Sequence, residues 1–336
     1  LVILYSTSAY NGQVKFHDSF YYLKKQAFAT VLGIVLMLFV AGMDYHIWQR
    51  LAVFGYLAAV ALSVAVMLFG REINGSKRWL ALGPFSFQPS EFAKVALILF
   101  LADLVTKNVK TIGKMWTLCR IMFWILPIVG LVGASNLSTA IIILGIGVIL
   151  IFVASPKYAQ FALMGIAGAC FMGIFLALES YRLERLAIWR NPEKYEKGYQ
   201  TLQGLYAIGS GGVFGVGIGN SVQKLGFVPE AQNDMIFSII CEELGLAGAG
   251  IIVFLFLLLI WRFFLIASGS RDLFGALIAT GAMAHMMIQV ILNIAVVTNT
   301  IPNTGITLPF ISYGGTSVMF LLIEMGLVLS VSQVVD

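Results

Sequence analysis

The amino-acid sequence predicts an all-α polytopic membrane protein with about ten transmembrane helices. Hydrophobic residues occupy 60% of its 336 positions and charged residues only 11%, which gives a mean hydropathy of +0.93. A soluble domain of this composition would expose apolar side chains to water on every face. Apolar runs of about 20 residues, the length that crosses the hydrocarbon core, recur along the whole chain.

The apolar runs define the expected spans in chain order. The first, residues 1–10, is expected to be a truncated helix, and the others lie near 20–42, 48–70, 90–106, 116–134, 138–154, 156–178, 235–263, 273–297 and 314–334. Together they predict one transmembrane domain over residues 1–336. The loop cations divide almost evenly between the two sides, so the positive-inside rule leaves the orientation undecided.

One long polar interval, residues 179–234, separates the seventh span from the eighth. Its glycine-rich stretch AIGSGGVFGVGIGN fits neither GxGxxG nor a P-loop and follows no predicted strand, which argues against nucleotide binding. We expect tightly turned backbone there, lying against a ligand or the membrane surface. No nucleic-acid partner is expected.

Metal and disulfide sites find no support in the sequence. The cysteines are odd in number and lie in apolar runs, which is typical of core packing; they are Cys119, Cys170 and Cys241. The three histidines have no paired-ligand spacing, so we expect no dedicated metal site.

Four segments on one side of the membrane carry candidate site residues. The first, KRWLALGPFSFQPSEFAK, contains Lys77, Arg78, Glu91 and Lys94. Glu91 and Lys94 are three residues apart at a predicted helix start with Ser90 as N-cap, so they share a face and can pair. The segment is either a juxtamembrane anchor with an internal ion pair or a cationic cradle for a phosphate-bearing lipid.

The second segment, SYRLER, places Arg182 and Arg185 three residues apart, so that both point to one side of a helix. Arginine forks bind phosphate oxygens in a bidentate way. The alternative is an amphipathic interfacial helix anchored by Tyr181 and Trp189, and both interpretations can hold together.

The third segment, VPEAQNDMIF, sets two carboxylates before a long apolar run. Pro229 fits the first position of a helix, and Glu230 in the first turn would be favoured by the helix dipole. Asp234 follows four residues later on the same helical face, where an ionisable group is costly and usually functional. A carboxylate at that boundary can have a raised pKa and act as a general base, or it can form a structural ion pair.

The fourth segment, TNTIPNTGITLPFISYGGTS, joins the last two spans. Pro302 and Pro309 forbid a continuous helix, and Gly314 permits close approach of the backbone to a ligand. Irregular backbone at membrane depth is tolerated where it lines a cavity, although a plain connecting loop is the alternative. Ser312 and Gly314 are the candidate substrate-contacting residues here.

The first, third and fourth of these segments, with YQTLQGLYAIGSGGVFGVGIGNS before the third, resemble the signature blocks of the SEDS family, which comprises FtsW, RodA and SpoVE. The resemblance covers nearly the whole chain and is closer to the FtsW and SpoVE branch. It implies a ten-helix glycosyltransferase of the bacterial cytoplasmic membrane. Such an enzyme polymerises lipid II into glycan strands at the outer face, beside a class B penicillin-binding protein that crosslinks them.

The resemblance also assigns residues. The family's catalytic aspartate falls at Asp234, and the glutamate and lysine of its QPSE block match Glu91 and Lys94. The four segments and the long loop are then extracytoplasmic. One block departs from the family pattern, because ASNLSTA carries Asn136 where many members have an acidic residue, which puts any role of that carboxylate in doubt here.

The chemistry of the residues fits this assignment, with Asp234 as the base that takes the proton from the acceptor hydroxyl. We expect a cationic clamp on the pyrophosphate, formed by Lys77, Arg78, Lys94, Arg182, Arg185 and Lys224. Of these cations, Arg78, Lys94, Arg182 and Arg185 are expected to converge on one cavity near Asp234. Glu91 and Glu230 would position these cations or the acceptor. No cofactor is identified, and participation of a divalent cation stays open. The alternatives are a lipid II flippase or transporter, and a non-catalytic scaffold for the penicillin-binding protein.

Overall fold

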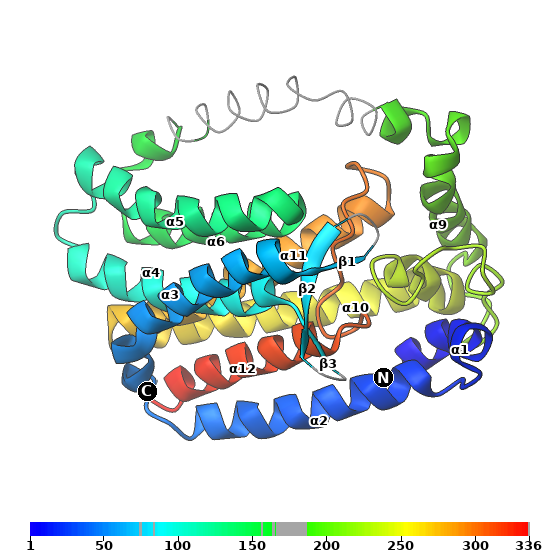
Figure 1. The fold of residues 1–336 in the computed structure, drawn as a ribbon, viewed down its shortest axis with the longest axis horizontal. Helices are drawn as coiled ribbons and strands as arrows, with labels where there is room; N and C mark the ends of the chain where they lie inside the picture. The colour runs from blue at the N-terminus through cyan, green and yellow to red at the C-terminus, as the bar shows by residue number, and fades with distance from the viewer. Residues whose placement is uncertain (74–75, 83–84, 156, 163–164, 166–186, 335–336) are drawn as a thin grey trace. The chain divides into compact units, whose positions relative to one another are not determined.

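The computed structural model describes residues 1–336 except 74–75, 83–84, 156, 163–164, 166–186 and 335–336 (Figure 1). Its α-helices are α1 (Val2–Phe16), α2 (Tyr21–Ala41), α3 (His46–Phe69), α4 (Pro89–Asn108), α5 (Met115–Ser135), α6 (Leu137–Ala154), α9 (Tyr199–Ser210), α10 (Ile236–Gly269), α11 (Leu273–Val297) and α12 (Gly315–Ser332). Two short 3-10 helices, Pro192–Lys194 and Glu196–Gly198, precede α9. The predicted all-α membrane class is confirmed, since seven of the described helices are long and apolar enough to cross a membrane.

Every predicted span that falls on described residues coincides with a helix. The run at 273–297 matches α11 at both ends, whereas the run at 235–263 underestimates α10, which continues to Gly269. The predicted seventh span, 156–178, falls largely outside the described residues. The total of ten spans therefore stays a prediction.

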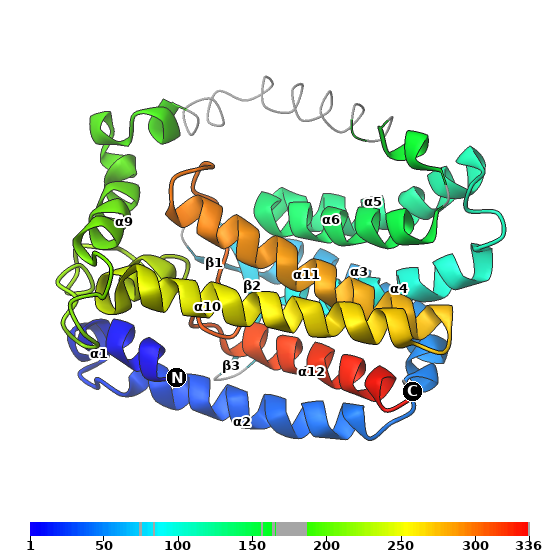
Figure 2. The ribbon, with the colours of Figure 1, turned by 180° about the vertical axis from the view of Figure 1, so that it is seen from behind.

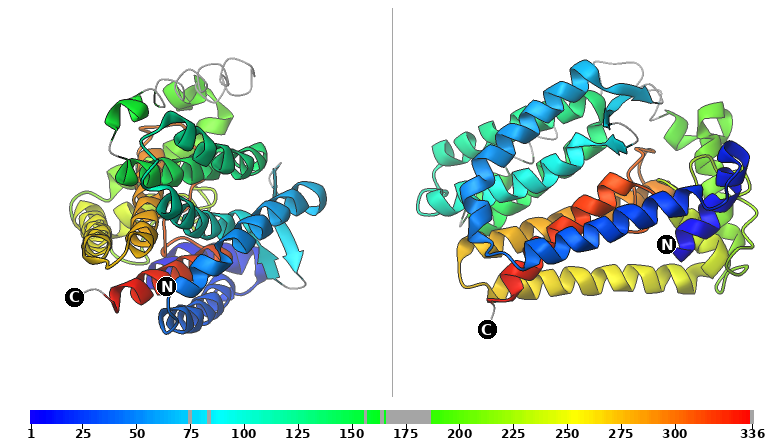
Figure 3. Two further views of the ribbon diagram at one scale, coloured as in Figure 1. Left: turned by 90° about the vertical axis from the view of Figure 1, so that its left-hand side faces the viewer. Right: turned by 60° about the horizontal axis from the view of Figure 1, so that its bottom comes forward.

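Three short strands between α3 and α4 form a small antiparallel sheet that the sequence analysis did not predict. Its strands are β1 (Arg71–Ile73), β2 (Ser76–Leu82) and β3 (Phe85–Phe87), in the order β1-β2-β3. Gly70 ends α3 in an extended conformation, and the sheet follows directly at that end of the helix (Figure 3). The overlooked signal is the Asn-Gly pair at 74–75, the usual sequence mark of a hairpin turn.

The chain divides into two compact units. The first contains Leu1–Phe28, Ala162–Leu258 and Gln289–Gly315, and the second contains Ala29–Phe161, Leu259–Ile288 and Thr316–Asp336. Helices α2, α10 and α11 each contribute residues to both units. The expected single transmembrane domain stays a prediction.

The second unit is built around α4, which packs against α3, α5 and α6. Apolar residues spaced by four along α4 have no exposed surface, namely Ala93, Leu97, Leu101 and Val105. Tyr56 of α3 stacks on Phe100 with ring centroids 4.3 Å apart and donates a hydrogen bond to the Trp124 carbonyl at 2.6 Å. Helices α5 and α6 lie side by side (Figure 2). This packing fixes the start of α4, where Glu91 and Lys94 lie.

The first unit contains α1, α9, the start of α10 and the end of α11, together with the irregular segments 211–235 and 298–314. Helices α1 and α9 gather around the start of α10 in both views (Figures 1 and 2). The segment that leads into α10 is anchored by buried apolar side chains, which are Val228, Ala231 and Met235. Asp234 therefore lies in a well-packed part of the chain although its backbone is not helical.

Candidate active site

Asp234 lies in a turn directly before α10, and its side chain is buried, with the residue only 9% exposed. The expected helix start at Pro229 is wrong, because α10 begins at Ile236. Glu230 has a left-handed backbone with φ 53°, and the Asn233 amide donates to its carbonyl at 2.9 Å, so the chain forms a turn there. Glu230 and Asp234 consequently do not share a helical face as predicted.

Side-chain amides hold the Asp234 turn in place. Gln200 of α9 donates to Asp234 Oδ1 across a long 3.5 Å, and Asn293 of α11 donates to the Asp234 carbonyl at 2.9 Å. The same Asn293 amide donates to the carbonyl of Ile306 at 2.7 Å, which ties the 298–314 segment to this turn. The backbone of Asp234 is thus fixed firmly, and its carboxylate accepts the long hydrogen bond from Gln200 together with hydrogen bonds from the backbone amides of Asp234 and Met235.

Burial dominates the electrostatics of Asp234 and raises its pKa to about 6, with a further contribution from the negative charge of Glu230. No lysine or arginine forms an ion pair with Asp234 in the part of the chain that the structure describes. The structural ion-pair alternative therefore finds no support among these residues. Gly305, with φ 69°, passes close to the carboxylate, because a Cβ built on it would lie 3.7 Å from Asp234 Oδ2.

The 298–314 segment is irregular, as its prolines predict, and it is held by polar contacts to its neighbours. Ser312 Oγ accepts from the Leu308 amide at 2.8 Å, and the Tyr313 amide donates to the Gln232 carbonyl at 2.8 Å. Gln26 of α2 accepts from the Gly314 amide at 3.1 Å and donates to the Ser312 carbonyl at 3.3 Å. Ser312 and Gly314 thus have internal partners, and their contact with substrate stays a prediction.

Several residues of this region escaped the sequence analysis. They are side-chain amides placed in or beside apolar helices, namely Asn11, Gln26, Gln200 and Asn293. Asn11 of α1 donates to Gln232 Oε1 at 2.9 Å, two residues before Asp234. Burying an amide inside an apolar run costs free energy unless the amide is hydrogen-bonded. The presence of these amides within apolar runs is therefore the sequence signal that could have identified them.

The predicted pair of Glu91 and Lys94 is confirmed. Lys94 Nζ lies 3.0 Å from Glu91 Oε2, with 2% and 8% of the two side chains exposed. The predicted N-cap is wrong, because α4 begins at Pro89 with Gln88 as N-cap, and Ser90 is inside the helix. A second buried pair in the same unit joins His285 Nδ1 and Glu324 Oε2 at 2.7 Å, and the sequence analysis missed it.

The remaining predicted cations have different surroundings. Lys77 is exposed, and Arg78 Nε donates to the Ser135 carbonyl at 2.9 Å. Lys224 is buried and lies 2.6 Å from Glu243 Oε1. Arg182 and Arg185 lie outside the described residues. Asp234, Glu230 and Lys224 belong to the first unit and Arg78, Glu91 and Lys94 to the second, so their convergence on one cavity stays a prediction.

Asn136 has a local role that requires no charge. It is the N-cap of α6, where its side chain accepts from the Thr139 amide at 3.3 Å. Asparagine and aspartate serve as N-caps about equally well. In the part of the chain that the structure describes, no group of three His, Cys, Asp or Glu side chains could hold a metal ion.

The glycine-rich segment packs against α10. Gly245 interrupts α10 with φ 68°, so the Leu246 and Ala247 amides bond to Gly212 and Val213 carbonyls at 2.9 Å instead of continuing the helix. In exchange, the Val216 and Gly217 amides donate to the freed carbonyls of Glu242 and Glu243, also at 2.9 Å. The segment 211–217 thus replaces the hydrogen bonds that the broken helix lacks.

Gly211→Ala is expected to destabilise the protein by about 1–3 kcal/mol, because a side chain there forces two backbones apart. A Cβ on Gly211 would lie 1.9 Å from the Cys241 carbonyl oxygen. Gly209→Ala is the matched control, since that Cβ meets nothing within 4 Å and the residue lies in α9. Thermal unfolding in detergent measures the stability of both variants. Equal melting temperatures would contradict the close approach of Gly211 to the α10 backbone.

Comparison with known proteins connects this geometry to a family. The family described as "Cell cycle protein" (FTSW_RODA_SPOVE) matches residues 1–336. The chain is 39% identical to "Stage V sporulation protein E" of Bacillus subtilis (strain 168), over 99% of this chain and 93% of that protein. It is 34% identical to "Probable peptidoglycan glycosyltransferase FtsW" of Geobacter sp. (strain M18), over 99% and 92%.

Solved structures agree with these relatives. A chain of the structure described as "Structural coordination of polymerization and crosslinking by a peptidoglycan synthase complex" is similar with a TM-score of 0.83 and 28% identity, over 99% of this chain and 95% of that one. The rod shape determining protein RodA of Thermus thermophilus is similar with a TM-score of 0.70 and 27% identity, over 99% and 94%.

Proposed function

The chain belongs to the FtsW, RodA and SpoVE family of cell cycle proteins, and on that basis we propose that it is a bacterial peptidoglycan glycosyltransferase. It polymerises lipid II into glycan strands at the outer face of the cytoplasmic membrane. Its partner is a class B penicillin-binding protein that crosslinks the strands. The similarity to relatives named as peptidoglycan glycosyltransferases and to a peptidoglycan synthase complex supports the reaction and the partner.

The observation that carries this function is the buried carboxylate of Asp234, whose pKa is raised to about 6 and which has no ion pair among the described residues. A carboxylate so placed can accept a proton from a sugar hydroxyl. The acceptor oxygen then forms a bond to the anomeric carbon of the donor, whose bond to the pyrophosphate breaks. Asp234 receives the hydroxyl proton, and the lipid pyrophosphate departs with the electron pair.

The leaving pyrophosphate needs positive charge. Of the predicted clamp, Lys77 and Arg78 lie on β2, Lys94 lies in the first turns of α4 and Lys224 pairs with Glu243, while Arg182 and Arg185 lie outside the described residues. Cations held in a site of low dielectric stabilise charge that develops in the transition state. Glu91 supports the clamp by pairing with Lys94, and Glu230 lies on the turn before Asp234.

The decisive experiment is a glycan-chain assay on the purified protein with lipid II, with and without its class B penicillin-binding partner. Glycan strands are expected in the presence of the partner. A protein that moves lipid II between liposome leaflets but makes no glycan would be a flippase. A protein that does neither, yet binds the partner, would be a scaffold.

The rate of polymerisation is expected to depend on pH with an acidic limb near pH 6. Burial raises the pKa of Asp234 to about 6, so below that pH the carboxyl carries the proton that it must accept. We expect kcat/KM for lipid II to fall about tenfold per unit below pH 6 and to level off above it. Asp18→Asn, which changes an exposed carboxylate that pairs with Lys24, should leave the limb in place. A flat profile between pH 5 and 7 would contradict the assignment.

A further inference from the structure

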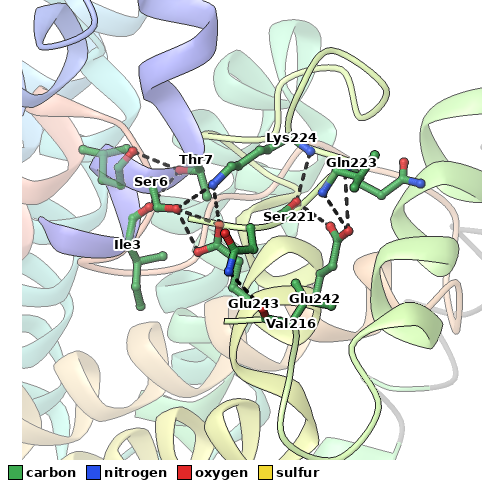
Figure 4. Close-up of polar contacts among 12 residues, drawn as sticks. Ile3, Ser6, Thr7, Val216, Ser221, Gln223, Lys224, Glu242 and Glu243 are labelled. Carbon is green, nitrogen blue, oxygen red and sulfur yellow. Dashed lines mark hydrogen bonds and ion pairs between the residues drawn. The ribbon is translucent and has the colours of Figure 1, made fainter. Parts of the chain in front are cut away.

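A buried polar cluster joins α1 to the first turns of α10 (Figure 4). Glu243 accepts from Ser6 Oγ at 2.6 and 2.8 Å and from Lys224 Nζ at 2.6 Å. Lys224 Nζ also donates to Ser6 Oγ at 2.9 Å, which closes a triangle. All three residues are less than a tenth exposed, so removing either the lysine or the glutamate would leave the other as a buried charge without this partner.

The neighbouring Glu242 binds the other side of the same turn (Figure 4). Its carboxylate accepts from the Ser221 hydroxyl, from the Val222 amide at 3.0 Å and from the Gln223 amide at 3.5 Å. Consecutive glutamates on α10 therefore hold residues 221–224 through backbone and side-chain donors at once. We call Ser6, Ser221, Lys224, Glu242 and Glu243 the latch.

The latch is connected to Asp234 by residues 225–233, a short stretch of chain that hydrogen bonds hold in place. The Val228 amide donates to the Gln223 carbonyl at 2.9 Å, which returns the chain toward the latch. Further on, Gln232 is held by Asn11 of α1 and by the Tyr313 amide. Helix α1 thus contacts the segment at both ends, through Ser6 at the latch and through Asn11 beside Asp234.

We propose that the latch residues are positioning residues that fix the 225–235 segment, and with it the Asp234 carboxylate, for the transfer reaction. This inference rests on the proposed function. It gives Lys224 a role through the segment, not through contact with the pyrophosphate, because its ammonium already has a carboxylate and a hydroxyl partner. A base held by a rigid neighbouring shell keeps the geometry that proton transfer requires.

The first test separates positioning from substrate contact by kinetics on the full chain with its partner. In Lys224→Met, a positioning role predicts that kcat falls about 10- to 100-fold while KM for lipid II stays within about twofold. Lys224→Arg, which keeps the charge, should recover most of kcat. The acidic limb should also move below pH 6 in Lys224→Met, because a loosened segment lets water reach Asp234. Lys107→Met, which breaks the pair with Asp103 on α4, is the matched control and should change none of these.

Two results would overturn the proposal. A rise in KM at constant kcat in Lys224→Met would show that the ammonium binds substrate directly. Unchanged kcat, KM and pH profile would show that the latch has no part in the reaction.

The second test does not depend on enzymatic activity. The double variant Lys224→Met/Glu243→Gln removes both buried charges and should fold even where a single change leaves one charge unpaired. Amide hydrogen exchange of residues 225–235 should be faster in it than in the wild type, while exchange in α12 stays the same. Equal protection of 225–235 would overturn the positioning role. If the wild type makes no glycan, the proposed function fails, and hydrogen exchange still reports whether the latch holds the segment.

Discussion

Asp234→Asn is expected to lower glycan polymerisation by about 10²- to 10⁴-fold, because an amide keeps the size of the carboxyl group but cannot accept the acceptor's proton. Folding should survive, since Asn293 ties this turn through the Asp234 carbonyl, which the substitution keeps, and the side-chain bond from Gln200 is long at 3.5 Å. The sign of the stability change follows from the raised pKa. An acid whose pKa is higher in the folded state destabilises that state when it ionises, so at pH 7 the asparagine variant should melt no lower than the wild type.

The assay uses purified protein with lipid II and the penicillin-binding partner, with contaminating synthases excluded. Asp18→Asn makes the same chemical change at an exposed carboxylate and should keep full activity. Full polymerase activity in Asp234→Asn would defeat the assignment and leave the carboxylate without a catalytic role. Loss of lipid II translocation in the variant, with a wild type that makes no glycan, would point to the flippase.

Glu91→Gln is expected to destabilise the protein by about 3–5 kcal/mol, because it leaves the buried Lys94 ammonium without its carboxylate partner. Lys94 is only 1% exposed, so water cannot replace the lost charge. The effect should appear as a lower melting temperature in detergent and as reduced turnover with lipid II.

The control for this change is Glu193→Gln, an isosteric substitution at an exposed glutamate. It should alter neither stability nor activity. A second variant, Glu91→Gln/Lys94→Met, removes both charges and should recover part of the lost stability, as buried pairs often do when both members are replaced. Equal melting behaviour and turnover for Glu91→Gln and Glu193→Gln would remove Glu91 from the site.

Local sequence patterns were enough to predict those parts of the chain that are regular helices. The mostly apolar run at 273–297 predicts α11 to the residue, and the three-residue spacing of Glu91 and Lys94 predicts their pairing. Both features follow from helical periodicity, which the sequence expresses directly. The turn at 229–234 was mistaken for a helix start because Pro229 and two acidic residues imitate one, whereas a left-handed residue at 230 forms a turn.

The glycine-rich segment shows a second limit of prediction from the sequence. Its glycines indicate close approach of backbone to something, but the sequence cannot name the neighbour. The structure identifies it as the interrupted α10, where Gly211 and Gly215 lie too close to backbone carbonyls for any side chain. Close approach between segments that are far apart along the chain depends on tertiary packing.

The sequence by itself therefore determined the membrane class, the helices that correspond to long apolar runs, and Asp234 as the candidate base. Only the tertiary structure decided which polar groups surround these residues. It paired Lys224 with Glu243 and Ser6, and it brought Gln200 and Asn293 to Asp234 from helices distant in sequence. The physical reason is that a buried charge or amide needs a partner but does not specify it, so the folded arrangement of the helices supplies the partner.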